Sequence, residues 1–234
     1  MDIPLFSLIV PAAGKGKRME ADVPKPYLQL GKRTVLEHTL SCFVGLPGLI
    51  EIIVSTSDQY KGQTEDILQR LFPEHKTRVV QGGAERQDSI FNAVKTVGEE
   101  IDLVAVHDAV RPFVSKSAVE KCLATAFKSG GAILAVPVKD TIKRVNSQGQ
   151  ILDTPVRSEL WQAQTPQIFS RSILLKAYMN AGRSGVVGTD DASLVELIGG
   201  DVRVVEASRD NFKLTYPLDF KIAKLLIEEK EQGD

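Results

Sequence analysis

The sequence predicts an α/β protein with a mostly parallel central sheet. Short apolar runs alternate with segments that carry helix-start and helix-stop signals, the order expected of parallel strands joined by helices. Glycine-bearing and charged loops follow several of these runs, and such loops form the binding sites of parallel sheets. No internal repeat or low-complexity linker interrupts the sequence. We therefore expect a single domain over residues 1–234, with a β-arm inserted at about 140–156.

Six apolar runs are the predicted strands, because each has the length and branched side chains typical of a buried strand. In chain order they are Leu5–Val10, Glu51–Ser55, Thr77–Val80, Leu103–His107, Ala132–Val136 and Val202–Glu206. Four segments are predicted helices, and two begin with a capping box, in which Ser or Thr precedes Glu by three residues. The helices run from Thr34 (boxed with Glu37) to about Val44, from about Arg86 to Val97, from Ser117 (boxed with Glu120) to near Gly130, and from Pro217 to Glu229.

One segment breaks the alternation of strands and helices. Thr141–Val145 and Gln150–Asp153 are predicted to form a hairpin around the turn Asn146–Gly149. An isolated hairpin is only marginally stable, so it must pack either on its own domain or on a second subunit. We favour the second alternative, because an arm that projects from a complete sheet is a natural dimerisation element. The sequence therefore predicts a homodimer.

Composition and charge exclude several classes of protein. Hydrophobic content of 43% and charged content of 25% are ordinary for a globular protein. A net charge of −1 argues against general binding to nucleic acids or membranes. The first residues do not resemble a signal peptide, and the two cysteines, Cys42 and Cys122, belong to no metal-spaced cluster. We expect a cytoplasmic protein with reduced thiols, or a protein of the plastid stroma if the chain is a processed plant protein.

The segment after the first strand, PAAGKGKRMEADVPK, predicts a polyphosphate site. Small residues let the main chain approach a ligand, and their amides can face phosphate oxygens. No Lys-Ser or Lys-Thr pair completes a P-loop, and Met19 stands where the dinucleotide fingerprint needs glycine. The alternative is a surface turn with solvated lysines. The small residues are Ala12, Ala13, Gly14 and Gly16, and the cations are Lys15, Lys17, Arg18 and Lys25.

Two further loops follow predicted strands. Asp108 and Arg111 should lie at the carboxyl edge of the sheet, where a carboxylate can hold Mg²⁺. The alternative is a helix cap or an Asp108–Arg111 salt bridge, and His107 is interpreted as structural. The amides of the Gly82-Gly83 turn, with Ser89, could recognise the edge of a base, or the turn could only reverse the chain.

Six blocks together resemble the 2-C-methyl-D-erythritol 4-phosphate cytidylyltransferase family. They are PAAGKGKRM followed by PK, GGAERQDSI, HDAVRPF, QTPQIF, GTDDAS and DNFKLT, in register from the first strand to the last helix. The resemblance implies a Rossmann-like, doubly wound sheet, a projecting β-arm used for dimerisation, and Mg²⁺ as cofactor. It also implies transfer of CMP from CTP to 2-C-methyl-D-erythritol 4-phosphate in the non-mevalonate isoprenoid route, with release of pyrophosphate.

The resemblance also implies roles for individual residues. Arg18 and Lys25 match the catalytic cations, which suits a reaction that gathers negative charge around the α-phosphorus. No general base is needed, because a phosphate monoester is largely dianionic at neutral pH. Asp108 matches the aspartate that binds Mg²⁺. The nucleotide pocket comprises Ala12, Ala13, Gly14, Lys15, Gly83 and Ser89, and the sugar-phosphate site comprises Asp108, Arg111, Thr141, Thr165, Thr189, Lys213 and Arg157, the last acting within its own subunit or across the dimer.

Several alternatives remain open at this stage. Taken singly, Lys213 could be an ordinary strand lysine, Thr165 a turn residue and Thr189 a helix N-cap. Pro26 and Ala84 depart from the family's usual glutamine and acidic residue, with effects expected on CTP affinity and base selectivity.

Three other activities are alternatives to the one that this resemblance implies. A ribitol-5-phosphate cytidylyltransferase shares the HD-x-VRPF and PVR…QTPQ segments, but the opening PAAG favours the methylerythritol substrate. A nucleotide-dependent oxidoreductase is disfavoured by the missing dinucleotide fingerprint. A non-catalytic sugar-nucleotide sensor would bind nucleotide without turnover.

Overall fold

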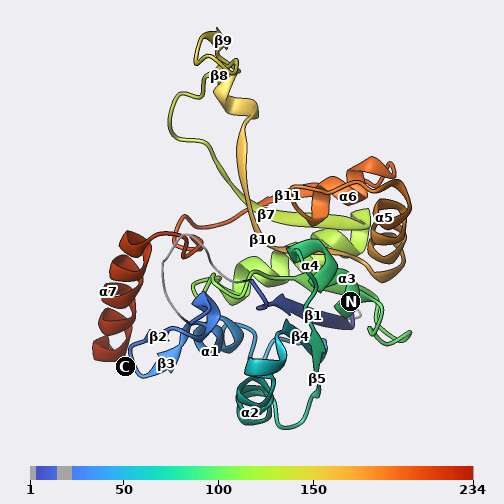
Figure 1. Ribbon diagram of the computed structural model, residues 1–234, viewed down its shortest axis with the longest axis vertical. Coiled ribbons are helices and arrows are strands. Elements are labelled where there is room, and N and C mark those ends of the chain that lie inside the picture. Colours follow the sequence, from blue (N-terminus) through green and yellow to red (C-terminus); the bar gives the residue numbers. More distant parts are fainter. Residues whose placement is uncertain (1–3, 15–22, 234) are drawn as a thin grey trace.

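The computed structural model describes residues 4–14 and 23–233, which build a seven-stranded sheet with helices on both faces (Figure 1). The predicted cations Lys15, Lys17 and Arg18 lie outside the described residues. Every neighbouring pair of strands is parallel except those made by β10, which is antiparallel to both β6 and β7. In spatial order the strands are β11 (Arg203–Glu206), β7 (Gly131–Pro137), β10 (Trp161–Ser170), β6 (Leu103–Val106), β1 (Phe6–Pro11), β4 (Leu49–Thr56) and β5 (Lys76–Gln81).

The predicted α/β class and mostly parallel sheet are confirmed. All six predicted strands are present, and β1 and β6 are buried almost throughout, because helices cover both faces of the sheet. The sequence prediction missed β10, which lies between β7 and β6. Pro166 and three glutamines in that segment obscure the strand signal. The pairing of β10 with β7 is irregular between Ala163 and Gln167, so the ladder accommodates the proline there.

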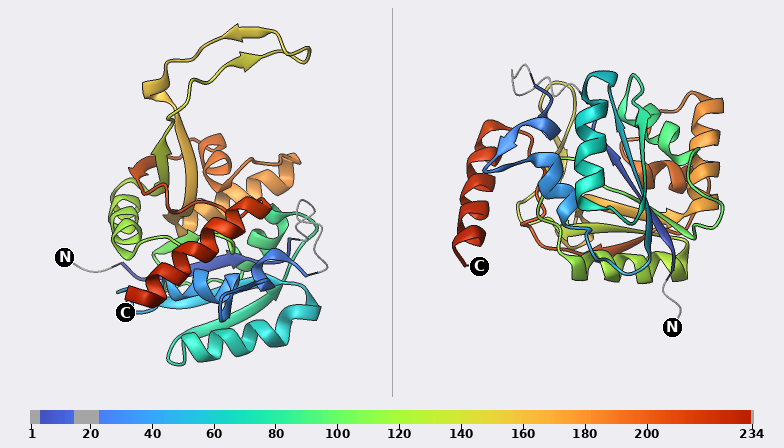
Figure 2. Two further views of the ribbon diagram at one scale, coloured as in Figure 1. Left: turned by 90° about the vertical axis from the view of Figure 1, so that its left-hand side faces the viewer. Right: turned by 90° about the horizontal axis from the view of Figure 1, so that it is seen from below.

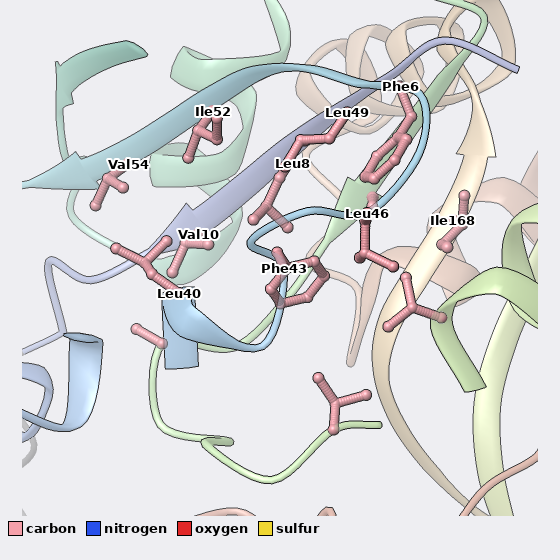
Figure 3. Packing of buried hydrophobic residues seen from close by; sticks show 14 of the residues in the cluster. Phe6, Leu8, Val10, Leu40, Phe43, Leu46, Leu49, Ile52, Val54 and Ile168 are labelled. Carbon is pink, nitrogen blue, oxygen red and sulfur yellow. The ribbon is translucent and has the colours of Figure 1, made fainter. Parts of the chain in front are cut away.

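Successive residues of the strands point to opposite faces of the sheet and contribute to two hydrophobic clusters, one on each face. Figure 3 shows the first cluster, in which Leu8 and Val10 of β1 pack with Leu40 and Phe43. The first cluster is covered by α1 (Val35–Ser41), α2 (Lys61–Leu71) and α4 (Lys116–Ser129), and the second by α3 (Arg86–Val94), α5 (Arg171–Ser184) and α6 (Asp191–Leu197). The sequence prediction did not include α2, α5 and α6.

The two predicted capping boxes have different outcomes. The Thr34 hydroxyl accepts a hydrogen bond from the amide of Glu37 (3.2 Å), and the Glu37 carboxylate accepts one from the amide of Thr34 (2.7 Å), so this box is confirmed. The box at Ser117 is wrong. Ser115 caps α4 instead and accepts from the amide of Ala118 at 3.3 Å, since the helix begins one residue after Ser115.

The last helix, α7 (Pro217–Gly233), begins at the predicted proline and extends past the predicted end. It packs on the short hairpin of β2 (Gln29–Leu30) and β3 (Arg33–Thr34) through Leu30, Ala223 and Ile227. Within the described residues, no helix has both the length and the apolar character needed to cross a membrane.

The predicted hairpin forms a separate two-stranded sheet of β8 (Arg144–Val145) and β9 (Ile151–Asp153). The hairpin lies in the middle of the segment that joins β7 to β10 and forms its tip. It stands away from the remainder of the molecule in Figure 1 and in the left view of Figure 2. Its apolar side chains Val145, Ile151 and Leu152 are 50–59% exposed. We call residues 138–160 the arm.

Candidate active site

A cleft of about 860 Å³ opens at the carboxyl ends of β1, β5 and β6. This volume is within the usual range of small-molecule sites. The cleft joins four of the sequence blocks, which are far apart in the chain. Its lining residues are Pro11, Ala13, Gly14, Lys25, Pro26, Gly83, Ala84, Glu85, Arg86, Ser89, Asp108, Ala109, Val110, Lys213, Leu214 and Thr215.

The loop after β1 contributes main chain to one wall of the cleft. The amide of Ala12 donates to the carbonyl of Ser55 at 2.7 Å, which extends the β1–β4 ladder by one residue. Ala12 is therefore buried beneath the site, whereas Ala13 and Gly14 line it. A β-carbon at Gly14 would meet nothing within 4 Å, so the backbone there faces open space.

The Gly82-Gly83 turn is built against this loop. A β-carbon on Gly82 would lie only 2.2 Å from the β-carbon of Ala13, so only glycine allows this approach. The amide of Gly82 donates to the carbonyl of Thr56 (2.8 Å), and that of Gly83 donates to the Ser89 hydroxyl (2.9 Å). Both amides are thus engaged within the protein. Base recognition by this turn together with Ser89, one of the two sequence alternatives, stays a prediction, and both Gly83 and Ser89 line the cleft.

Asp108 is the electrostatic centre of the cleft. Its Oδ1 accepts from Nε of Arg86 at 3.2 Å, and its Oδ2 accepts from Nε of Arg111 at 3.2 Å. Nζ of Lys213 lies 3.1 Å from the same Oδ2. Burial alone would raise the pKa of Asp108, but the charges of these three cations outweigh it and hold the pKa well below its usual range. Asp108 is therefore ionised at neutral pH.

The Thr165 hydroxyl holds the backbone of Asp108 by a hydrogen bond. The amide of Asp108 donates to the Thr165 hydroxyl at 3.0 Å, so the hydroxyl's own proton goes to Nδ1 of His107, 3.1 Å away. This leaves the proton of the ring on Nε2, which donates to the carbonyl of Arg111 at 3.0 Å. Burial lowers the pKa of His107 to about 4, so the ring is neutral. The interpretation of His107 as structural agrees with these contacts.

Lys25 and Arg111 join the loops around the cleft. Lys25 begins the short helical turn Lys25–Tyr27; its side chain is almost fully buried and donates from Nζ to the carbonyl of Thr215. Arg111 donates from Nη1 to the carbonyl of Asn211 at 2.7 Å. The segment 211–215 is thereby held against both Lys25 and the Asp108 loop.

Six of the predicted site residues that the structure describes do not line this cleft, and three of them lie in exposed segments. The six are Ala12, Arg111, Thr165, Thr141, Arg157 and Thr189. Thr141 and Arg157 are exposed on the arm, where Arg157 donates to the carbonyl of Lys139 at 3.1 Å. Thr189 is exposed in the loop before α6. The N-cap of α6 is Asp190, so the alternative interpretation of Thr189 as that cap is wrong.

The sequence analysis missed Arg86 and Asp191. Both lie within blocks that carried the resemblance, but no local signal pairs two residues that are 105 positions apart. Nη2 of Arg86 donates to Oδ2 of Asp191 at 2.8 Å. Burial alone would lower the pKa of Arg86, but the carboxylates of Asp191 and Asp108 more than offset it and raise that pKa.

The fold and the cleft define an α/β nucleotide-binding enzyme of the kind that transfers phosphoryl or nucleotidyl groups. Glycine turns at the carboxyl ends of parallel strands can bring main chain to a ligand, and three cations surround the ionised carboxylate of Asp108. A family model described as 2-C-methyl-D-erythritol 4-phosphate cytidylyltransferase matches residues 6–229. The chain belongs to this family.

Individual relatives agree over nearly the whole chain. A protein of Halalkalibacterium halodurans named 2-C-methyl-D-erythritol 4-phosphate cytidylyltransferase is 40% identical over 227 residues, covering 97% of this chain and 99% of that protein. One of the same name from Bacillus thuringiensis is 44% identical over 220 residues, covering 94% and 96%. The crystal structure of 4-diphosphocytidyl-2C-methyl-D-erythritol synthase from Anaerococcus prevotii superposes with a TM-score of 0.87 at 30% identity, covering 96% of each chain.

Proposed function

We propose that this protein transfers the cytidylyl group of CTP to 2-C-methyl-D-erythritol 4-phosphate, giving 4-diphosphocytidyl-2-C-methyl-D-erythritol and pyrophosphate. One observation carries the proposal: in a chain of this family, the cleft brings two glycine turns and a cluster of cations around Asp108 to the same place. Such a cleft suits a triphosphate, because its main chain can approach closely and its cations offset the charge.

The cations act on the charge that develops during the transfer. Attack on the α-phosphorus places negative charge on its equatorial oxygens and on the departing pyrophosphate. Lys25 is nearly buried, so water screens its charge little, and its stabilisation of this charge is correspondingly strong. Arg18, outside the described residues, is assigned the same role. Ala13, Gly14 and Lys15 would seat the triphosphate.

Asp108 is the residue that would hold Mg²⁺. Carboxylate oxygens suit this hard cation, and the only other acidic residue that lines the described cleft is Glu85, which caps α3. Within the described part of the chain, no three His, Cys, Asp or Glu side chains gather as metal ligands. This donor set fits Mg²⁺ in its usual enzyme setting, with one carboxylate and the remaining positions left to phosphate oxygens and water. When bound, the ion would neutralise part of the negative charge of the triphosphate.

No side chain needs to act as a base toward the acceptor. Its phosphate monoester is largely dianionic at neutral pH (second pKa about 6) and is already nucleophilic. The neutral His107 ring is fully engaged by Thr165 and the Arg111 carbonyl, which agrees with a purely structural role. Arg111 and Lys213 flank the carboxylate and would position the acceptor phosphate.

Thr141, Arg157 and Thr189 would complete the acceptor site through a homodimer. Thr141 and Arg157 lie on the arm, and the arm stands away from the molecule in Figure 1. Its apolar side chains are half exposed or more, which favours a covering surface on a second copy of the chain. In such a dimer the arm of one subunit would bring Arg157 to the cleft of the other.

The test is pyrophosphate release with CTP and Mg²⁺ in the presence of either 2-C-methyl-D-erythritol 4-phosphate or ribitol 5-phosphate. We expect turnover with the first acceptor. Lys25→Met should lower kcat by about 10²-fold or more, as loss of a preorganised charge does. Lys32→Met, at an exposed lysine outside the cleft, is the matched control and should leave kcat unchanged. Turnover with ribitol 5-phosphate alone would show that the acceptor is assigned wrongly.

A further inference from the structure

Arg86, the first residue of α3, joins two carboxylates that come from different parts of the chain. Its Nε lies 3.2 Å from Oδ1 of Asp108, and its Nη2 lies 2.8 Å from Oδ2 of Asp191. The two contacts use different nitrogens of the guanidinium. Either contact can therefore be lost while the other persists.

Asp191 is built into the core and pairs there with Arg86. Its side chain is fully buried, and its Oδ1 accepts a hydrogen bond from the hydroxyl of Tyr178, itself buried on α5. Burial and the neighbouring carboxylate raise the pKa of Tyr178, so its hydroxyl remains a donor. A buried carboxylate needs a counter-charge, and Arg86 is the cation that the structure places on Asp191. Asp191 is therefore a permanent anchor for Arg86.

Asp108 has the opposite character, because its partners are shared and replaceable. Arg86 is the partner of Oδ1, while Arg111 and Lys213 share Oδ2. For Asp108 to hold a divalent cation, at least one of its carboxylate oxygens would have to be released by Arg86, Arg111 or Lys213. Releasing Oδ1 costs least if the departing guanidinium keeps a second carboxylate.

We propose that Asp191 is a positioning residue that retains Arg86 when Asp108 exchanges this arginine for the divalent cation of the nucleotide complex. The inference rests on the proposed function and deepens it, since it assigns how the carboxylate of Asp108 is neutralised in the free protein and released by Arg86 for the metal. In the free protein Arg86 neutralises Asp108. In the loaded protein Arg86 pairs with Asp191 alone.

The proposal predicts a specific defect for Asp191→Asn. The amide keeps the shape of the side chain and an oxygen that can accept from Tyr178, but it removes the charge that anchors Arg86. Among the described residues, Asp108 is then the one carboxylate that still pairs with Arg86, and the two pair more tightly. Metal binding at Asp108 should weaken, whereas CTP without metal should bind no more weakly, because the substitution adds no negative charge that would repel the triphosphate.

The experiment measures the Kd of CTP by calorimetry, with excess EDTA and with saturating Mg²⁺, in the absence of acceptor. The ratio of the two Kd values reports the coupling between metal and nucleotide. We expect Asp191→Asn to reduce this ratio by about tenfold or more, as loss of one charged contact typically does. The matched control is Asp190→Asn, because this adjacent carboxylate accepts hydrogen bonds from Gln167 and Ser193, whereas Arg86 donates to Asp108 and Asp191. Its ratio should match that of the wild type.

A second variant tests whether Asp191 acts through Arg86. Arg86→Met with Asp191→Asn removes both charges together, which buried pairs often tolerate. With the competing cation gone, the ratio should return to the wild-type value or exceed it. If the double variant is as impaired as Asp191→Asn, or if Asp190→Asn shows the same reduction, the proposal is wrong and the proposed function stands. If the wild-type protein does not bind CTP, both are wrong.

Discussion

Thr165→Val should destabilise the protein strongly although it changes the side-chain volume little. The Thr165 hydroxyl accepts from the amide of Asp108 at 3.0 Å and donates to Nδ1 of His107 at 3.1 Å. All three residues are buried, with exposed fractions of 0–6%. The methyl group of valine would leave one backbone donor and one ring acceptor without partners.

The magnitude follows from the number of orphaned groups. Each buried polar group left unsatisfied costs about 1–3 kcal/mol, so the two groups together lower the free energy of unfolding by about 2–6 kcal/mol. In a chain of this size each kcal/mol shifts Tm by about 2–4 °C, which predicts a fall in Tm of roughly 4–24 °C.

The assay is urea unfolding followed by circular dichroism, with Thr165→Ser as control. Serine keeps the hydroxyl, so this variant should retain most of the lost stability and pay only for the missing methyl group. Equal stabilities of Thr165→Val and the wild type would refute the hydrogen-bond assignment. A large loss in Thr165→Ser as well would mean that packing of the methyl group, and not the hydroxyl, holds the Asp108 loop.

Three further predictions concern the glycine turn, the buried histidine and the arm. Gly82→Ala should lower Tm and weaken CTP binding, because its β-carbon would lie 2.2 Å from that of Ala13; Gly14→Ala, which meets nothing within 4 Å, should leave Tm unchanged in the same thermal scans. The pKa of His107 falls from 6.5 to about 4 on folding, so as the pH falls from about 6.5 to 4 the unfolded chain takes up a proton that the folded chain does not. Stability should decrease by about 3 kcal/mol over that range, and urea unfolding of His107→Gln should show a smaller decrease. Leu152→Glu on the arm should convert a dimer into monomers in sedimentation experiments without lowering Tm of the monomer; an unchanged dimer would contradict the role of the arm.

The sequence predicts the sheet well where its strands are buried on both faces. Continuous apolar runs such as Leu103–Val106 mark strands directly. β10 was not predicted because Gln164, Pro166 and Gln167 lie in its middle. The side chains of the two glutamines form tertiary hydrogen bonds that no local pattern reveals. The error at α4 has a smaller cause: Ser115 and Ser117 are both plausible caps, and only the helix start decides between them.

The candidate site was predictable where loops follow parallel strands. The turns at Gly14, Gly83 and Asp108 meet because β1, β5 and β6 all end at the same edge of the sheet. The sequence could not show which charged side chains pair with one another in the cleft. Arg86 reaches Asp108 and Asp191 from another part of the chain, and such pairs appear only after folding.

The most direct test of the central claim follows oxygen from the acceptor. The protein is incubated with CTP, Mg²⁺ and 2-C-methyl-D-erythritol 4-phosphate labelled with ¹⁸O in its phosphate, and the products are analysed by ³¹P NMR. If the acceptor phosphate attacks the α-phosphorus of CTP, the label appears in the oxygen that bridges the two phosphorus atoms of 4-diphosphocytidyl-2-C-methyl-D-erythritol. The pyrophosphate is then unlabelled. Label in the pyrophosphate, or CMP formed without the diphosphate product, would contradict the account.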